Sequence, residues 1–173
     1  MATYHSLRFS GFTAKSVIFD AADNWGGVSI GIRSIDFWKD GAKIDNLLTT
    51  NFTASATNEV LPDFDVGNAF HTPASKIGTH VNTCWLTSPS VADQRLICVF
   101  NTPTAFDEIV INNFHFNGGG TEHGIQNVKI HISTDTITST VYDEAISNSD
   151  LIFDGVFNQH ALLNVQDDQI LTL

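Results

Sequence analysis

The sequence predicts an all-β protein, built as one two-sheet β-sandwich that takes up residues 1–173 as a single domain. Short segments alternate apolar and polar residues with the period of a half-buried strand, at 5–12, 28–37, 106–112 and 125–133. Turn-forming residues lie between strands, at 23–27, 39–41, 117–120 and 154–155. No window of about a dozen residues carries the stripe of an amphipathic helix. Many short strands with turns between them are typical of a sandwich or a barrel.

The strand predicted over 28–37 changes parity along its length. Val28 and Ile30 share one face and Ile35 lies on the other, which predicts a β-bulge at 33–34. A later run is apolar without interruption, as in the core strand of a sandwich, and covers 95–100. Further strands are predicted towards the end of the chain, at 137–142, 151–153, 161–165 and 169–173.

The stretch 56–93 breaks this pattern. It contains Pro62, Pro73 and Pro89, three of the four prolines, and shows little alternation. A loop of this length inside a compact domain is usually functional, or else it contains short elements that the pattern does not show. The sequence is compatible with either interpretation.

The charge of the chain excludes two classes of partner. Acidic residues outnumber basic ones 19 to 8, the formal net charge is −11, and the basic residues form no cluster. Nucleic acids and anionic membranes are bound through Lys and Arg, so we expect neither as a partner. The sequence has no apolar run of membrane-helix length, and its first residues lack the features of a classical signal peptide.

The two cysteines, Cys84 and Cys98, form neither a disulfide framework nor a zinc motif. Both have apolar neighbours, so two buried thiols are the simpler interpretation, and a bridge between adjacent strands is the alternative. Trp38 and Trp85 adjoin or lie within apolar strands and are predicted to be core residues.

Several short motifs resemble the F5/8 type C, or discoidin, family and its relatives among the family 32 carbohydrate-binding modules. The residues at 68–70 (Asn-Ala-Phe) and 83–85 (Thr-Cys-Trp), with the strand at 94–100, are similar to that family's Asn-Ala-Phe-Asp-Gly, Thr-x-Trp and following strand. The strand predicted at 125–133 ends in a Ser-x-Asp turn, as in the family. The segment 6–37 is similar to the family's closing strands.

This resemblance implies a galactose-binding-like fold, a jelly-roll-like sandwich of two sheets. The family's closing strands come first in this chain, so the resemblance implies a circular permutant whose two ends lie in neighbouring strands. Permuted domains of this kind occur in tail and fibre proteins of bacterial viruses. The resemblance therefore also implies a virion component. We expect a place in a virion or at a cell surface without a classical signal peptide, or otherwise in the cytoplasm.

Members of the family often hold a structural calcium ion. Here the family's two carboxylates are replaced by His71 and Ser34, and only Thr83 of its side-chain ligands remains. Asp63 and Asp65 lie nearby in the sequence and are weak candidate replacements. Because calcium needs about six to eight oxygens, several of them from carboxylates, we expect no cofactor, and calcium is doubtful.

Trp25 lies in the polar turn 23–27, next to Asp23 and Asn24. In the carbohydrate modules that the chain resembles, an aromatic residue of this loop stacks on the sugar. A flat ring suits the apolar face of a pyranose, and neighbouring amide and carboxylate groups can reach its hydroxyls. The alternative is a tryptophan that folds back to cover one end of the core.

The glycine-rich loop 114–124 supplies the remaining candidate ligand-binding residues, which are His115, Asn117, Glu122 and His123. They could form a ligand-binding rim or a weak metal site. The spacing of the two histidines matches no recognised metal motif, so a hairpin loop with solvated polar residues is a simpler interpretation than a metal site. This loop is expected to gather at one pole of the sandwich with 20–27 and 63–65.

Catalysis has little support in the sequence. No serine lies in a Gly-x-Ser-x-Gly elbow, and adjacent carboxylates on a strand point to opposite faces, so we expect no enzyme. The first hypothesis is a non-catalytic binding or adhesion domain that recognises carbohydrate, as a virion tail or fibre component. The alternative is a structural virion protein, a decoration or tail-assembly subunit whose loops contact protein. A homo-oligomer is compatible with both, and a cellular assembly adaptor is a weaker third hypothesis.

Overall fold

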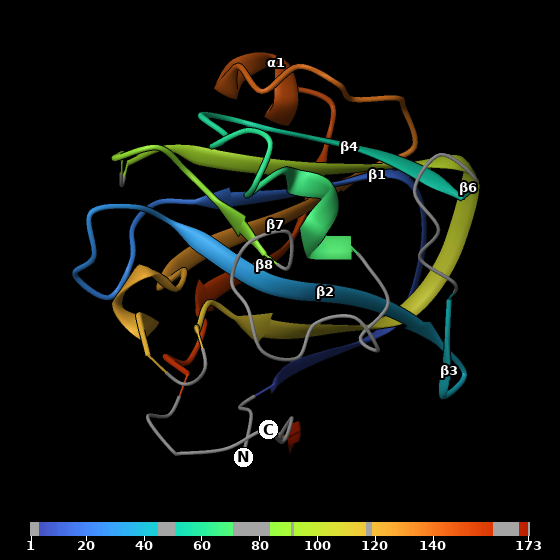
Figure 1. Cartoon of the computed structure of the whole chain (residues 1–173). Helices are drawn as coiled ribbons and strands as arrows, with labels where there is room; N and C mark the ends of the chain where they lie inside the picture. Colours follow the sequence, from blue (N-terminus) through green and yellow to red (C-terminus); the bar gives the residue numbers. More distant parts are fainter. Residues whose placement is uncertain are drawn as a thin grey trace.

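The computed structural model describes residues 4–44, 51–70, 84–90, 92–116, 119–160 and 170–172. Its strands are β1 (Tyr4–Ala21), β2 (Gly31–Lys39), β3 (Ala42–Lys43), β4 (Phe52–Ala56), β5 (Trp85–Leu86), β6 (Gln94–Asn113), β7 (Asn127–Ser133), β8 (Asp150–Val156) and β9 (Ile170–Thr172). Its helical segments are the 3₁₀ helices η1 (Val66–Phe70) and η3 (Thr121–His123) and the α-helix α1 (Tyr142–Ile146) (Figure 1). The protein is therefore all-β, as predicted. No helix in the described ranges is long and apolar enough to cross a membrane.

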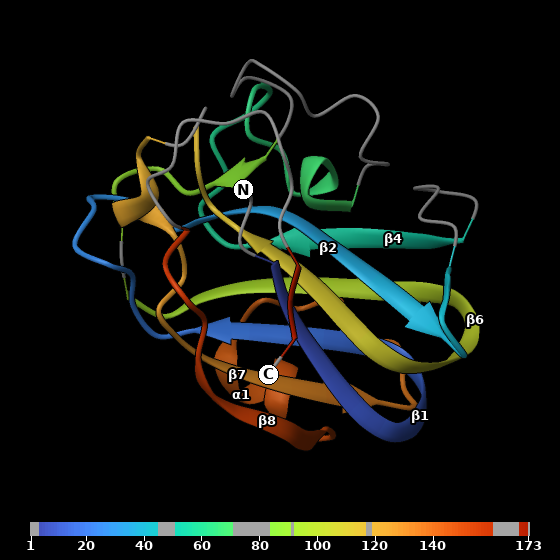
Figure 2. The ribbon, with the colours of Figure 1, turned by 90° about the horizontal axis from the view of Figure 1, so that it is seen from below.

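The two long strands β1 and β6 pair with each other along most of their length and bend together. The pairing of β1 is interrupted at 8–12 and again at 14–16. Gly11 lies in the first interruption with a φ of 107°, a conformation that residues with a side chain rarely adopt. Figure 2 shows both bends on its right-hand side. The ribbon of paired strands thus folds over on itself, and each half belongs to a different layer.

Each half of this ribbon carries the strands of one layer. In the first layer, β2 pairs with the half of β6 near 108–113, β3 and β5 pair with β2, and β9 pairs with β1. In the second layer, β4 pairs with the half of β6 near 96–100, β7 pairs with β1, and β8 pairs with β7. The predicted two-layer sandwich is confirmed. The two ends lie in neighbouring strands as expected, because β9 runs parallel to the start of β1.

Phenylalanine rings from both layers fill much of the space between them. The ring centroid of Phe37 on β2 lies 5.1 Å from that of Phe100 and 5.3 Å from that of Phe106, both on β6. Phe70 of η1 and Phe52 of β4 extend the cluster, with their ring centroids 5.0 Å apart. All five side chains are buried. Burial of each such ring contributes about 1.5–3 kcal/mol to stability.

A smaller apolar cluster lies on the outer face of the second layer. Ile18 of β1 and Ile97 of β6 belong to it, and Ile137 and Ala145 pack against them. These last two residues come from the segment 134–149, which we call the strap and which includes α1, at the top of Figure 1. Because the main core covers one face of β6 and the strap covers the other, the first part of this strand is buried on both faces.

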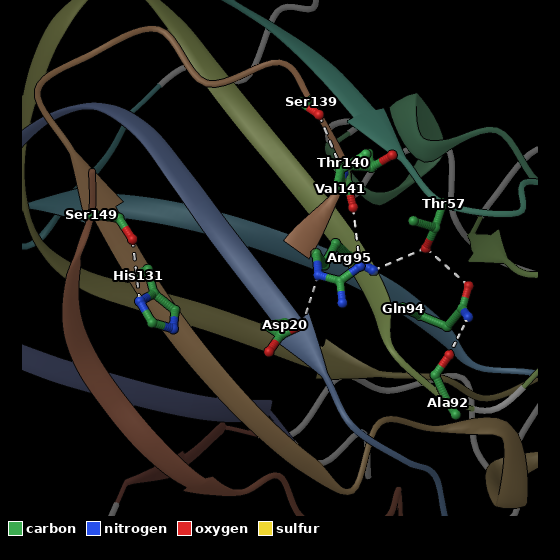
Figure 3. A network of polar contacts seen from close by, with 10 residues as sticks. All are labelled: Asp20, Thr57, Ala92, Gln94, Arg95, His131, Ser139, Thr140, Val141 and Ser149. Carbon is green, nitrogen blue, oxygen red and sulfur yellow. Dashed lines mark hydrogen bonds and ion pairs between the residues drawn. The ribbon is translucent and has the colours of Figure 1, made fainter. Parts of the chain in front are cut away.

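Arg95 attaches the strap to the sheet (Figure 3). Its Nη1 donates a hydrogen bond of 3.0 Å to the carbonyl oxygen of Thr140, and its guanidinium carbon lies 5.0 Å from the ring centroid of Tyr142. Its Nε lies 3.1 Å from Oδ1 of Asp20, and both side chains of this ion pair are largely buried. Burial raises the pKa of the Asp20 carboxyl group, and the nearby Arg95 opposes this shift.

His131 of β7 attaches the far end of the strap. Its Nδ1 lies 3.3 Å from Oγ of Ser149, and this hydroxyl donates a hydrogen bond of 2.8 Å to the carbonyl oxygen of Ile146. Since the hydroxyl proton is used there, Nδ1 must carry the imidazole proton. Nε2 is then a buried acceptor with no hydrogen-bond partner among the described residues. Burial lowers the pKa of His131, so its ring is neutral near pH 7.

The predicted β-bulge in β2 is present. Its register against β6 shifts between Ile32 and Ser34, and Ile35 then points into the main core. Val28 does not share the buried face that was predicted for it: its side chain is 68% exposed. The physical reason is that the strand begins only at Gly31, so Val28 lies in the preceding loop.

Two turn predictions have opposite outcomes. The turn at 39–41 is confirmed as a two-residue hairpin between β2 and β3, in which Asp40 and Gly41 both have positive φ. The turn at 154–155 is wrong, because Gly155 lies inside β8. A Cβ atom at this position would lie 2.8 Å from Cζ of Phe153, so the glycine makes room for a ring and does not form a turn.

Three further predictions concern the strands expected at 137–142 and 161–165 and the irregular stretch 56–93. The strand predicted at 137–142 is wrong, because this segment belongs to the strap, which lies across the sheet and forms no ladder with it. The stretch 56–93 contains η1 and β5 in its described part, which confirms the interpretation as short elements there. The strand predicted at 161–165 and Pro73 lie outside the described residues.

Both cysteines are buried as predicted, whereas the two tryptophans predicted to be core residues differ in burial. Cys84 and Cys98 are both buried and form no disulfide, as in the simpler interpretation, and burial raises the pKa of the Cys98 thiol well above its usual value. Trp85 is fully buried in the main core. Trp38 near the end of β2 is only half-buried, because the neighbouring hairpin covers it incompletely.

Ile97→Ala is expected to lower the free energy of unfolding by about 3 kcal/mol, because it leaves a cavity between the sheet and the strap. Urea denaturation monitored by circular dichroism measures the change. Leu151→Ala, on the exposed side of the edge strand β8, is the control and should change the free energy by no more than about 0.5 kcal/mol. Equal effects of the two substitutions would show that the strap does not cover Ile97.

Candidate functional site

Two of the three loops that were expected to meet at one pole do so. The loop between β1 and β2 and the loop between β6 and β7 are joined by backbone hydrogen bonds, at the left of Figure 1. The amide of Gly27 donates to the carbonyl oxygen of Glu122 at 3.0 Å, and the amide of Gln126 donates to that of Asp23 at 3.1 Å. A Cβ atom on Gly27 would lie 2.5 Å from Nδ1 of His123, so only glycine permits this approach. We call the two joined loops the loop pole.

Asn113, at the end of β6, closes the second of these loops. Its Nδ2 donates to the carbonyl oxygens of Ile125 at 2.7 Å and of Asn158 at 3.0 Å. Its Oδ1 accepts from the amides of Phe114 at 2.9 Å and of Ile125 at 2.8 Å. All four hydrogen-bonding positions of the amide are used. The sequence pattern does not single out Asn113, whose only signal is an asparagine at the end of an apolar strand.

Two of the predicted ligand-binding residues are engaged within the protein. Asn24 is buried and donates to the carbonyl oxygens of Gly27 and Ser29, at 2.9 and 2.6 Å. The carboxylate of Asp23 accepts hydrogen bonds of 2.8 to 2.9 Å from the backbone and side-chain amides of Asn127, at the start of β7. Both residues therefore shape the loop, and neither has its full hydrogen-bonding capacity available for a ligand.

Trp25 is half-buried at the loop pole. Its indole nitrogen is enclosed and has no hydrogen-bond partner among the described residues. Trp25 as a whole is only partly exposed, so both interpretations of the sequence, a ligand-binding ring and a cover for the core, stay open.

His115 is half-buried and contacts other parts of the protein. Its ring stacks on that of His160, with ring centroids 3.7 Å apart and the planes 15° from parallel. Nδ2 of Asn112 lies 3.5 Å from its Nε2. Burial, together with the positive charges of His160 and Arg33, lowers the pKa of His115 to about 3. The imidazole is therefore neutral near pH 7.

Glu122 and His123 remain as candidate rim residues. The Glu122 side chain is half-exposed, and its Oε1 lies 3.7 Å from Nε2 of His123. The His123 ring meets that of Phe114 edge to face, with ring centroids 5.8 Å apart, and its Nδ1 lies 3.3 Å from the carbonyl oxygen of Ser29. Asn117 lies outside the described residues.

The third predicted loop, at 63–65, lies beside β5. The carbonyl oxygen of Phe64 accepts a long hydrogen bond of 3.4 Å from the amide of Leu86, and the next residue, Thr87, accepts through its Oγ1 from the amide of Ile30. This loop therefore connects to the loop pole indirectly, through 86–87.

The weak calcium candidates have structural roles here. Oδ1 of Asp65 accepts from the amide of Gly67 at 2.6 Å at the start of η1, and the carbonyl oxygen of Asp63 accepts from Nδ2 of Asn68 at 3.2 Å. Ser34 is buried in β2. The other two positions, Thr83 and His71, lie outside the described residues. Within the described part of the chain, no group of three or more His, Cys, Asp or Glu residues could hold a metal ion.

Comparison with known proteins adds no relative: no protein-family model, no curated protein and no solved structure matches the chain.

A chelator is expected to leave the melting temperature almost unchanged, because Asp65 is engaged in a turn. Differential scanning calorimetry with and without excess EDTA measures this. A calcium site saturated at about 100 times its dissociation constant would add about 2.7 kcal/mol. A fall of several degrees on chelation would therefore contradict the prediction.

Lowering the pH from 8 to 5 is expected to reduce the free energy of unfolding by about 2 kcal/mol through His115 alone. In the unfolded chain this imidazole binds a proton below its usual pKa near 6.5, whereas the folded pKa is about 3. Stability is therefore lost as the pH falls through 6.5. Urea denaturation at both pH values measures the loss.

The control for this prediction is His115→Phe, which keeps a ring against His160 but does not titrate. Its unfolding free energy should fall less than that of the unchanged protein over the same range, by about 2 kcal/mol. All other histidines titrate in both proteins, so the difference isolates His115. An identical fall in both proteins would show that His115 is not held neutral.

Proposed function

We propose that this protein is a non-catalytic binding domain that recognises carbohydrate through its loop pole, as a component of a virion tail or fibre. The partly exposed Trp25, in a loop held by backbone hydrogen bonds, carries the proposal. A fixed aromatic surface suits the apolar face of a sugar ring, and Glu122 and His123 supply polar groups on the adjoining loop. The virion context rests on the resemblance to permuted discoidin-like domains.

The polar groups of the described structure support a binding role without catalysis. Asp23 is held by Asn127, and its carboxylate is not free to act as a base. Ser149 lies beside His131, but its hydroxyl donates to a backbone carbonyl, and the strap covers the pair. A serine nucleophile needs its proton directed to the histidine, so this pair is not arranged for acyl transfer.

A second function, a structural virion subunit that contacts protein, is favoured by a different observation. Val28 and Phe116 expose 68% and 39% of their surface, on the same two loops that form the loop pole. Exposed apolar side chains at loop tips are typical of protein contacts, where the central residues lose their water on binding. The two functions therefore place their contacts on the same end of the sandwich but on different side chains.

Trp25→Ala is expected to weaken glycan binding at least about tenfold, because one aromatic ring often dominates a small binding site. A glycan array on the isolated protein identifies the ligand, and titration calorimetry with that ligand measures the loss. The variant should lose only about 1–2 kcal/mol of stability, since the side chain is half-buried. Val28→Ala, on the same loop, is the matched control and should bind the glycan as the unchanged protein does.

The opposite pattern would favour the structural subunit. In that case the array shows no glycan, Trp25→Ala unfolds the domain, and Val28→Ala reduces assembly with partner subunits, as measured by sedimentation velocity.

A further inference from the structure

A groove lies at the end of the sandwich opposite the loop pole, where the hairpin of β2 and β3 faces the bend of β1. It encloses about 410 Å³, which is within the range of about 300–1,000 Å³ found for small-molecule sites. Its walls are the hairpin turn at 40–41 and the side chains of Arg8, Phe9, Ser10, Lys39, Asp107 and Glu108. We call it the hairpin groove. In Figure 1 the hairpin lies at the right, near the label of β3.

One wall of the hairpin groove is held by Asp107 of β6. Its Oδ2 accepts a hydrogen bond of 2.9 Å from Nζ of Lys39 and one of 3.0 Å from the amide of Asp40. The hydrogen bond from the Asp40 amide, and then that from Lys39, lower the pKa of the Asp107 carboxyl group. The hydrogen bond to Asp107 in turn raises the pKa of Lys39. Both groups therefore stay charged over the physiological range, and the two hydrogen bonds connect Asp107 to the hairpin turn.

The other wall is formed by the neighbouring residue, Glu108. Its Oε1 accepts a short hydrogen bond from Oγ of Ser6 and lies 3.4 Å from Nε of Arg8. The Glu108 side chain is only 15% exposed, whereas that of Arg8 is 68% exposed. Glu108 is thus held by Ser6 and Arg8, whereas most of the Arg8 side chain is exposed to solvent.

The hairpin groove has both hydrogen-bond donors and hydrogen-bond acceptors available to a ligand. The two outer nitrogens of Arg8 and the hydroxyl of Ser10, which are donors, form no hydrogen bond with another described residue. Oε2 of Glu108 and Oδ2 of Asp40 likewise remain available as acceptors. Phe9 adds apolar surface between them, and its inner side packs against the main core.

The charge balance limits the ligands that fit. Three carboxylates and two cations line the groove, so its net charge is negative and it repels anions. A divalent cation would have to displace Lys39, which is paired with two of the three carboxylates. A hydroxyl group donates and accepts at the same time, so neutral polyhydroxylated molecules match the mixed groups and the apolar Phe9.

We propose that the hairpin groove is a second ligand site and that it binds a neutral saccharide unit. The ring's apolar face lies against Phe9, and its hydroxyls bond to Arg8 and Glu108. This proposal does not depend on glycan binding at the loop pole. If both sites bind sugar, the domain has one site at each end and binds a long or repeated glycan more tightly than either site alone.

Nuclear magnetic resonance titration of the ¹⁵N-labelled protein tests the proposal. The probes are the methyl glycosides of glucose, galactose and N-acetylglucosamine, with glucuronic acid and inorganic phosphate as anionic comparisons. At least one neutral glycoside should shift the backbone amides of 8–10, 39–41 and 107–108, with saturation at millimolar concentration, as a small and open site allows. The two anions should leave these amides unchanged.

Arg8→Ala is expected to weaken this binding about tenfold, because the side chain supplies charged hydrogen bonds to the ligand. The side chain is mostly exposed, so folding should not change. Lys129→Ala is the matched control: it removes another half-exposed cation, which faces Asp154 on β8, and should leave the titration unchanged.

Three results would overturn the proposal: no neutral glycoside shifts the amides of the groove, phosphate or glucuronic acid shifts them more strongly, or Arg8→Ala binds as well as the unchanged protein. Trp25→Ala separates this test from that of the loop pole. It should leave the groove shifts intact, so failure of one site is visible while the other still binds.

Discussion

The pairing of β1 with β6 is the constraint on which the rest of the structure depends. The two strands stay hydrogen-bonded on both sides of their bends, so one ribbon supplies two neighbouring strands to each layer. The position of one layer therefore sets the position of the other. This fixes which phenylalanine rings of the two layers meet in the core. Gly11 contributes by adopting the positive φ that the bend of β1 needs. Both candidate sites lie at the ends that this folded ribbon creates.

Polar side chains inside the sandwich mostly hold backbone in place. Asn113 uses its whole amide to close a loop, and Asn24 does nearly the same in the loop it faces. Arg95 bridges Asp20 and the strap, where burial makes an unpaired charge costly. A consequence is that, in the part of the chain that the structure describes, few of these polar groups are available to a ligand. Those that remain lie on outer rims, such as Glu122 at the loop pole and Arg8 in the hairpin groove.

The two ends of the sandwich differ in chemistry for a structural reason. At the loop pole, long connections fold against each other, and their glycines allow close contact, so apolar and aromatic side chains are left at the tips. At the other end, the two-residue turn after Lys39 brings charged residues of three strands together, and they pair around Asp107. The loop pole therefore offers mainly apolar and aromatic side chains, and the hairpin groove offers mainly charged ones.

The sequence by itself determined the fold class, the bulge in β2 and the hairpin at 39–41, because alternation and turn chemistry are local properties. Only the tertiary structure decided the rest. Gly155 has the signature of a turn but makes room for Phe153 within a strand, and the segment at 137–142 has the pattern of a strand but serves as a cover. The candidate site divides in the same way. The sequence singles out Trp25, but which neighbouring polar groups stay free depends on partners from distant strands, such as Asn127 for Asp23, and no local pattern records them.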